Sequence, residues 1–100
     1  MTRAIRFAKD AVAELREARA WYERQRPGLG DELEEDLRVT LTAIAQSPES
    51  FAPVADVPGL RKALVARFPY VIVFKVTTKT VRVLAVAHAH RKPGYWSSRR

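Results

Sequence analysis

The chain has 100 residues, of which 47% are hydrophobic and 29% charged, and its formal net charge is +7. This balance permits one folded domain over residues 1–100, with a buried core, and excludes a disordered basic tail. Cysteine is absent, which excludes disulfides, and the apolar segments fall short of the roughly 18 residues that span a membrane, so we expect a cytoplasmic protein.

The first quarter of the chain is expected to form a short strand followed by a helix. Ile5 and Phe7 alternate with a polar residue, which is typical of an edge strand. Asp10 opens a stretch in which apolar residues recur at spacings of three and four as far as Tyr22, and the pair at 27–28, Pro-Gly, ends it. The charged residues of this helix mostly lie off the apolar stripe and are expected to be solvated: Glu14, Arg16, Glu17 and Glu23.

A second amphipathic helix is expected to begin near Gly30 and to end at Ser47-Pro48. Its first turns carry five carboxylates between Asp31 and Asp36. A negative charge near the positive end of the helix dipole stabilises the helix by about 0.3–1 kcal/mol at low salt. We interpret this run as a solvated helix start and not as a set of catalytic carboxylates. Two amphipathic helices joined by a tight turn predict an antiparallel helical hairpin.

The second half of the chain is expected to form a small sheet. Residues 48–60 contain three prolines and are expected to form a loop. Strands are expected over residues 61–67, 70–76 and 81–88, with a short hairpin connection at 77–80. The order β-α-α-β-β-β predicts an α+β fold in which the helical hairpin packs on one face of a mainly antiparallel sheet. We expect the other face to stay open to solvent or a ligand, because no further residues are left to cover it.

Positive charge is concentrated in the second half of the chain. Residues 51–100 carry a net charge of +9, whereas residues 1–50 carry −2. Such a surface suits a polyanion, most simply a nucleic acid, or an acidic protein segment. The side chains predicted to contact that target are Arg61, Lys62, Arg67, Arg82, Lys92 and Trp96. Burial is the alternative for Trp96, and the last two arginines, Arg99 and Arg100, are expected to form a frayed end.

A second group of residues, near the end of the last strand, has the chemistry to cleave RNA without a metal. Its members are His88, His90, Arg91 and Tyr95. Such cleavage needs a base for the ribose 2′-OH, a cation for the phosphate and an acid for the leaving oxygen, which imidazole, guanidinium and phenol supply. The alternative is a polar strand end without chemistry. The His-x-His spacing has no third ligand, so we expect no metal and no cofactor.

Several motifs together resemble the RelE/ParE superfamily of toxins. They are Trp21-Tyr22 late in the first helix, Leu60-Arg61-Lys62, Arg67-Phe68-Pro69-Tyr70, and the ending from His88 to Trp96. The resemblance covers essentially the whole chain. It implies the toxin of a bacterial type II toxin–antitoxin module, often named a plasmid stabilisation protein, and a cognate acidic antitoxin as the partner that holds it inactive.

The resemblance implies one of two mechanisms. RelE-like toxins cleave mRNA in the ribosomal A site with basic residues on the sheet and a C-terminal His or Tyr, whereas ParE-like toxins poison DNA gyrase. This chain has matching residue types at Lys62, Arg91 and Tyr95, but Tyr70-Val71-Ile72 stands where RelE-like toxins usually carry an arginine. Loss of one such donor costs about 3 kcal/mol of transition-state stabilisation. We therefore favour gyrase poisoning, with a ribosome-dependent mRNA endonuclease as the alternative and a non-toxic nucleic-acid-binding module as a second alternative.

Overall fold

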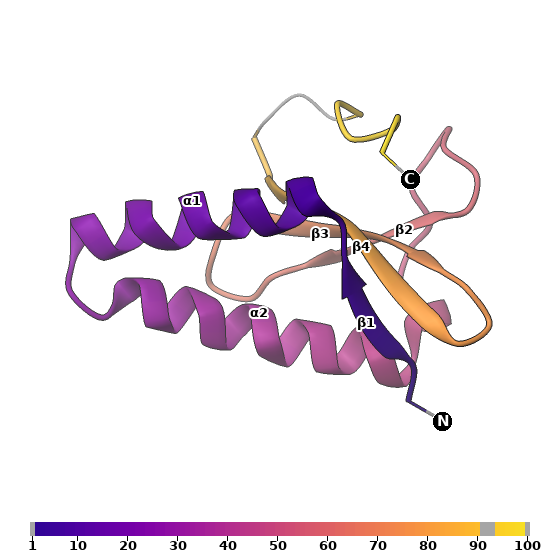
Figure 1. The fold of residues 1–100 in the computed structure, drawn as a ribbon, viewed down its shortest axis with the longest axis horizontal. Helices are drawn as coiled ribbons and strands as arrows, with labels where there is room; N and C mark the ends of the chain where they lie inside the picture. Colours follow the sequence, from indigo (N-terminus) through magenta and orange to yellow (C-terminus); the bar gives the residue numbers. More distant parts are fainter. Residues whose placement is uncertain (1, 91–93, 100) are drawn as a thin grey trace.

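The computed structural model describes residues 2–90 and 94–99, and its elements follow the predicted order β-α-α-β-β-β (Figure 1). The elements are β1 (Ala4–Phe7), α1 (Lys9–Gln25), α2 (Leu29–Gln46), the short 3-10 helix η1 (Pro48–Ser50), β2 (Leu60–Leu64), β3 (Tyr70–Val76) and β4 (Thr80–His88). The α+β class is therefore confirmed. None of the helices in the described part of the chain is long and apolar enough to cross a membrane.

The four strands form one mixed sheet in the order β1-β4-β3-β2. The β2–β3 and β3–β4 pairs are antiparallel, as predicted, and β1 joins β4 in parallel. The last residue of β1, Phe7, lies opposite Val83, whereas β4 continues to His88. Within the described residues, the second half of β4 therefore has no strand on this edge, and its backbone groups there need other partners.

The helical hairpin covers one face of the sheet. Figure 1 shows α1 and α2 running side by side in opposite directions. The largest buried side chains come from α2 and the sheet, namely Leu33, Leu37, Ile44, Leu60, Ile72, Phe74 and Leu84. On α1 the buried residues are small, Ala11 and Ala18, which lets this helix approach β4 closely.

The turn between the two helices is held by Glu23, which caps the start of α2. Its Oε2 accepts a hydrogen bond from the Gly28 N–H at 2.9 Å, and its Oε1 accepts one from the Gly30 N–H at 3.0 Å. These bonds satisfy N–H groups that the first turn of a helix leaves unpaired. They also lower the pKa of Glu23, the bond from Gly28 most strongly. The expectation that Glu23 is only a solvated charge was wrong.

This cap makes a pH-dependent contribution to stability. Because the pKa of Glu23 is lower in the folded chain than in the unfolded one, its contribution is present above the ordinary glutamate pKa and is lost as the pH falls through the folded value. We expect Glu23→Gln to lower the urea midpoint near neutral pH, and the difference from the parent protein to shrink at about pH 3. Glu17→Gln is the matched control on the same helix, and an equal pH dependence in both variants would contradict the assignment.

The face of the sheet away from the helices is partly covered, so the prediction of an open face was wrong. Val86 lines a hollow together with residues of α1, so Ala85 and Ala87 point to the opposite face, where both are buried. The loop at 54–57 and the C-terminal segment at 94–96 lie over this outer face. Local strand patterns gave no sign of this cover, because it is made by irregular segments.

Candidate functional site

The side chain of His88 lies on the helix side of the sheet. His88 pairs with Tyr70 in the β3–β4 register, and the two rings are 5.3 Å apart and nearly perpendicular. Tyr70 in turn lies 6.2 Å from the ring of Tyr22 on α1. The exposed His90 follows, and its backbone N–H donates to Nδ1 of His88 at 3.1 Å. The two predicted histidines are therefore neighbours, and His88 lies beside α1, at the boundary between the helix side and the outer face.

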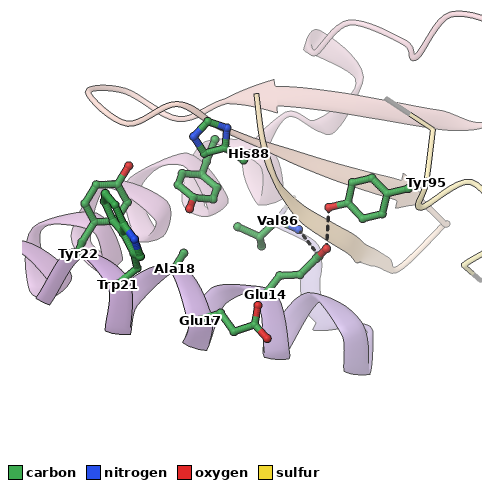
Figure 2. A pocket seen from close by; sticks show the side chains of 9 residues that line it. Glu14, Glu17, Ala18, Trp21, Tyr22, Val86, His88 and Tyr95 are labelled. Carbon is green, nitrogen blue, oxygen red and sulfur yellow. Dashed lines mark hydrogen bonds between the residues drawn. The ribbon is translucent and has the colours of Figure 1, made fainter. Parts of the chain in front are cut away.

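Tyr95 is joined to α1 through Glu14. The Tyr95 hydroxyl donates to Glu14 Oε2 at 2.6 Å, and Glu14 Oε1 accepts from the Val86 N–H at 3.0 Å (Figure 2). The Glu14 side chain is only 14% exposed. The prediction of a solvated Glu14 was wrong, because this carboxylate accepts a hydrogen bond from the edge of β4 that β1 leaves unpaired.

Arg99 completes this arrangement from the C-terminal segment. Its Nη1 donates to Glu14 Oε1 at 2.9 Å and to the Leu84 carbonyl at 3.1 Å, and its Nε lies 3.4 Å from Asp10 Oδ2. The guanidinium carbon also lies 5.1 Å from the centre of the Tyr95 ring. Arg99 was expected in a frayed end, and that prediction was wrong. Carboxylate and guanidinium together satisfy the edge groups that β1 leaves unpaired.

Two of the predicted target-binding arginines make contacts inside the chain. Arg61 donates from Nη1 to the Phe51 carbonyl at 2.6 Å, which fastens the segment after α2 to β2. Arg67 forms a two-pronged ion pair with Asp36 of α2, with N···O distances of 2.9 and 3.0 Å. Neither guanidinium lines the hollows that His88 and Tyr95 line.

The other predicted target-binding residues are scattered. Lys62 is exposed on the outer face, Arg82 is partly buried opposite Lys75, and Trp96 is only 6% exposed. The burial of Trp96 agrees with the alternative given for it. Arg91 and Lys92 lie outside the described residues, so their predicted roles stay predictions.

Two hollows meet near the end of β4. The first, which we call the aromatic hollow, has a volume of about 340 Å³ (Figure 2). It lies between α1, the start of β3 and the end of β4. It is lined by Glu14, Glu17, Ala18, Trp21, Tyr22, Tyr70, Val86, His88 and Tyr95. Burial raises the pKa of Tyr70, with a smaller effect from Tyr22, so the phenol stays neutral and able to donate.

The second hollow, the outer hollow, lies on the far face of the sheet and has a volume of about 440 Å³. Its lining includes Lys62, Val73, His88, Tyr95 and Trp96. His88 and Tyr95 thus border both hollows, at the boundary between the helix side and the outer face. Among the described residues no group of three or more His, Asp or Glu side chains is placed to hold a metal ion.

Comparison with known proteins gives the family. Residues 5–93 match the family described as "ParE toxin of type II toxin-antitoxin system, parDE". No curated protein matches the chain.

Two solved structures share the fold. A chain of the chromosomal ParDE toxin–antitoxin system from P. aeruginosa has a TM-score of 0.77 and 20% sequence identity, over 89% of this chain and 98% of that chain. A mutant of the E. coli toxin RelE in the free state has a TM-score of 0.68 and 23% identity, over 90% of this chain and 86% of that chain.

The family match spans most of the chain, and the fold is that of both solved structures, as the motifs predicted. The chain is therefore a member of the ParE toxin family, within the RelE/ParE superfamily: the toxin component of a type II toxin–antitoxin system, with a cognate antitoxin as its implied partner.

Proposed function

We propose that this toxin arrests growth by poisoning DNA gyrase and that an acidic antitoxin neutralises it. The observation that carries the proposal is the Tyr95 hydroxyl, which donates to the Glu14 carboxylate at 2.6 Å. A phenol in this bond is committed to a neighbouring side chain and is not directed at a departing oxygen of RNA. The match to the ParE toxin family supports the same mechanism.

In the described part of the chain, the arginines that could hold a phosphate are bound to other groups. Arg61 is bound to a backbone carbonyl and Arg67 to Asp36, while Arg99 is bound to Glu14. Phosphate stabilisation requires donors that are already aimed at the site where charge develops. Three arginines held by other partners do not meet that requirement.

A ribosome-dependent mRNA endonuclease is the second candidate, and one observation favours it. Lys62, His88 and Tyr95 all line the outer hollow, so a cation, an imidazole and a phenol border one concave surface. If RNA bound there, Tyr95 would have to leave Glu14 before it could act as an acid. The nuclease therefore requires a rearrangement that gyrase poisoning does not.

Induction of the toxin without its antitoxin separates these mechanisms. We expect growth arrest with an SOS response, cleaved DNA and intact messenger RNA, and we expect purified gyrase to lose supercoiling activity in the presence of the toxin. Prompt loss of protein synthesis with cut messages and intact DNA would overturn the proposal and leave the nuclease. Absence of any arrest would leave the non-toxic nucleic-acid-binding module.

A pair of substitutions tests the same point within the toxin. We expect the double variant His90→Ala/Tyr95→Phe to keep its toxicity, because gyrase poisoning makes no use of the imidazole or the phenolic proton. Removing general acid or base groups from a nuclease lowers the rate by about 10²–10⁴-fold for each group. The test compares colony counts after induction, with antitoxin binding as the control for folding. Loss of toxicity in a variant that still binds antitoxin would contradict the proposal.

A further inference from the structure

We propose that the aromatic hollow binds an arginine side chain of the cognate antitoxin. This inference goes beyond gyrase poisoning and does not depend on it, since it concerns the partner that neutralises the toxin and not the target. It follows from the walls, the charge and the floor of the hollow.

Aromatic rings form one wall of the hollow. Trp21 is 49% exposed, and its ring lies 4.9 Å from that of Tyr22 at nearly a right angle. The row of rings continues through Tyr70, 6.2 Å from Tyr22, to His88, 5.3 Å further on. Guanidinium groups stack on the faces of Trp and Tyr, and Trp is the stronger of these two partners.

Carboxylates give the hollow a charge opposite to that of the whole chain. Glu14 and Glu17 both line it, in a protein with a net charge of +7. Arg99 neutralises Glu14, whereas Glu17 has no ion pair or hydrogen bond to another side chain in residues 2–90 and 94–99. Glu17 stands one turn before Trp21 on α1, so carboxylate and indole lie on the same side of the helix.

The floor of the hollow is small and apolar. Ala18 and Val86 line it, and Figure 2 shows Ala18 between the aromatic wall and Glu14. A volume of about 340 Å³ can admit one long side chain, whose aliphatic stem would lie on these apolar groups while its charged end reaches Glu17.

The charge of the toxin also indicates which kind of molecule carries the arginine. Repulsion by a strongly positive protein weakens the binding of a free cation, although the unpaired Glu17 carboxylate still favours it over a neutral molecule of the same shape. A cationic side chain on an antitoxin segment that is already attracted to the basic surface does not face that barrier, because the other contacts hold it there. The antitoxin is the protein partner that the family implies.

The first test uses small probes that differ only in charge. N-acetyl-arginine amide and its neutral analogue N-acetyl-citrulline amide are titrated into the toxin, and the indole N–H resonance of Trp21 is followed by NMR. We expect the arginine probe to shift this resonance with a dissociation constant at least about 3-fold lower than that of citrulline. Equal effects of the two probes, or no shift at Trp21, would overturn the proposed arginine site.

The second test uses the antitoxin itself. We expect Glu17→Gln to weaken antitoxin binding by about 2- to 5-fold and Trp21→Leu by about 10-fold, whereas Glu35→Gln, a matched charge removal on α2, leaves binding unchanged. Both lining residues are exposed, so these variants should fold. Antitoxin affinity that is unchanged in Glu17→Gln and Trp21→Leu would overturn the antitoxin as the source of the arginine. Neither test reads out killing, so failure here is separate from failure of gyrase poisoning.

Discussion

Replacement of Glu14 by alanine is expected to release the C-terminal segment and to destabilise the toxin by about 2–4 kcal/mol. This carboxylate accepts hydrogen bonds from three groups, the Val86 N–H, the Tyr95 hydroxyl and the Arg99 guanidinium. Its loss leaves the partly buried Val86 N–H without an acceptor and takes one of its acceptors from the mostly buried Arg99 cation, and each such loss costs about 1–3 kcal/mol. Urea unfolding measures the loss of stability, and amide hydrogen exchange over residues 94–99 measures the release.

Two variants control for less specific effects of this substitution. Glu17→Ala removes the same charge from an exposed position of α1 and is expected to change stability by no more than about 0.5 kcal/mol. Tyr95→Phe removes one of the three donors and keeps the ring, so its cost should be close to one hydrogen bond, about 1 kcal/mol. A Glu14→Ala protein as stable as Glu17→Ala would show that the carboxylate does not hold the segment.

Most elements of the fold could be predicted from local patterns. The strand at 70–76 was predicted with its observed bounds, because a continuous apolar run follows Phe68-Pro69 and a polar turn ends it. Both helices were predicted to within two residues at their starts, since their apolar spacing and the intervening Pro27-Gly28 are strong signals. These features depend on neighbours in sequence, which is why they could be predicted.

The position of β1 and the arrangement around Glu14 depend on residues far apart in the chain. The parallel pairing of β1 with β4 joins Ala4 to Thr80, and no local pattern specifies such a register. Glu14 and Arg99 are 85 positions apart, so their contact could not be predicted from the residues next to either of them in the sequence. One signal was present. Glu14 is three residues after Ala11 and four before Ala18, both buried, which places it on the inner face of α1.

The candidate nuclease residues illustrate the same limit. His88, His90 and Tyr95 were grouped because they are close in sequence and chemically suited to RNA cleavage. In the structure the environment of His88 and Tyr95 is set by α1, since Glu14 binds Tyr95 and Tyr22 belongs to the ring cluster that reaches His88. Their residue types were visible in the sequence, but the partners that determine what each side chain can do were not.

Substitution of Gly30 by alanine is expected to destabilise the helical hairpin by about 1–3 kcal/mol, although alanine is the better helix former. Gly30 is buried in the first turn of α2, where a Cβ would lie 2.8 Å from the Arg19 carbonyl oxygen and 2.9 Å from Glu23 Oε1. The carboxylate of Glu23 can move, but the backbone of α1 cannot without separating the helices. Overpacking of this kind costs more than the roughly 1 kcal/mol that alanine gains in helix propensity.

Gly28→Ala is the matched control, because it lies in the same turn and lacks the close contact. Gly28 has a φ of +90° with no atom within 4 Å of an added Cβ, so the cost there is only that of a left-handed backbone, about 1–2 kcal/mol. The two variants should also differ in which residues they perturb. Gly30→Ala is expected to perturb the NMR shifts of Arg19 and its neighbours on α1, whereas Gly28→Ala should affect the turn alone. A Gly30→Ala protein that unfolds at the same urea concentration as the parent, or a higher one, would show that the helices can separate at no cost, and the close approach at Gly30 would then not determine the geometry of the hairpin.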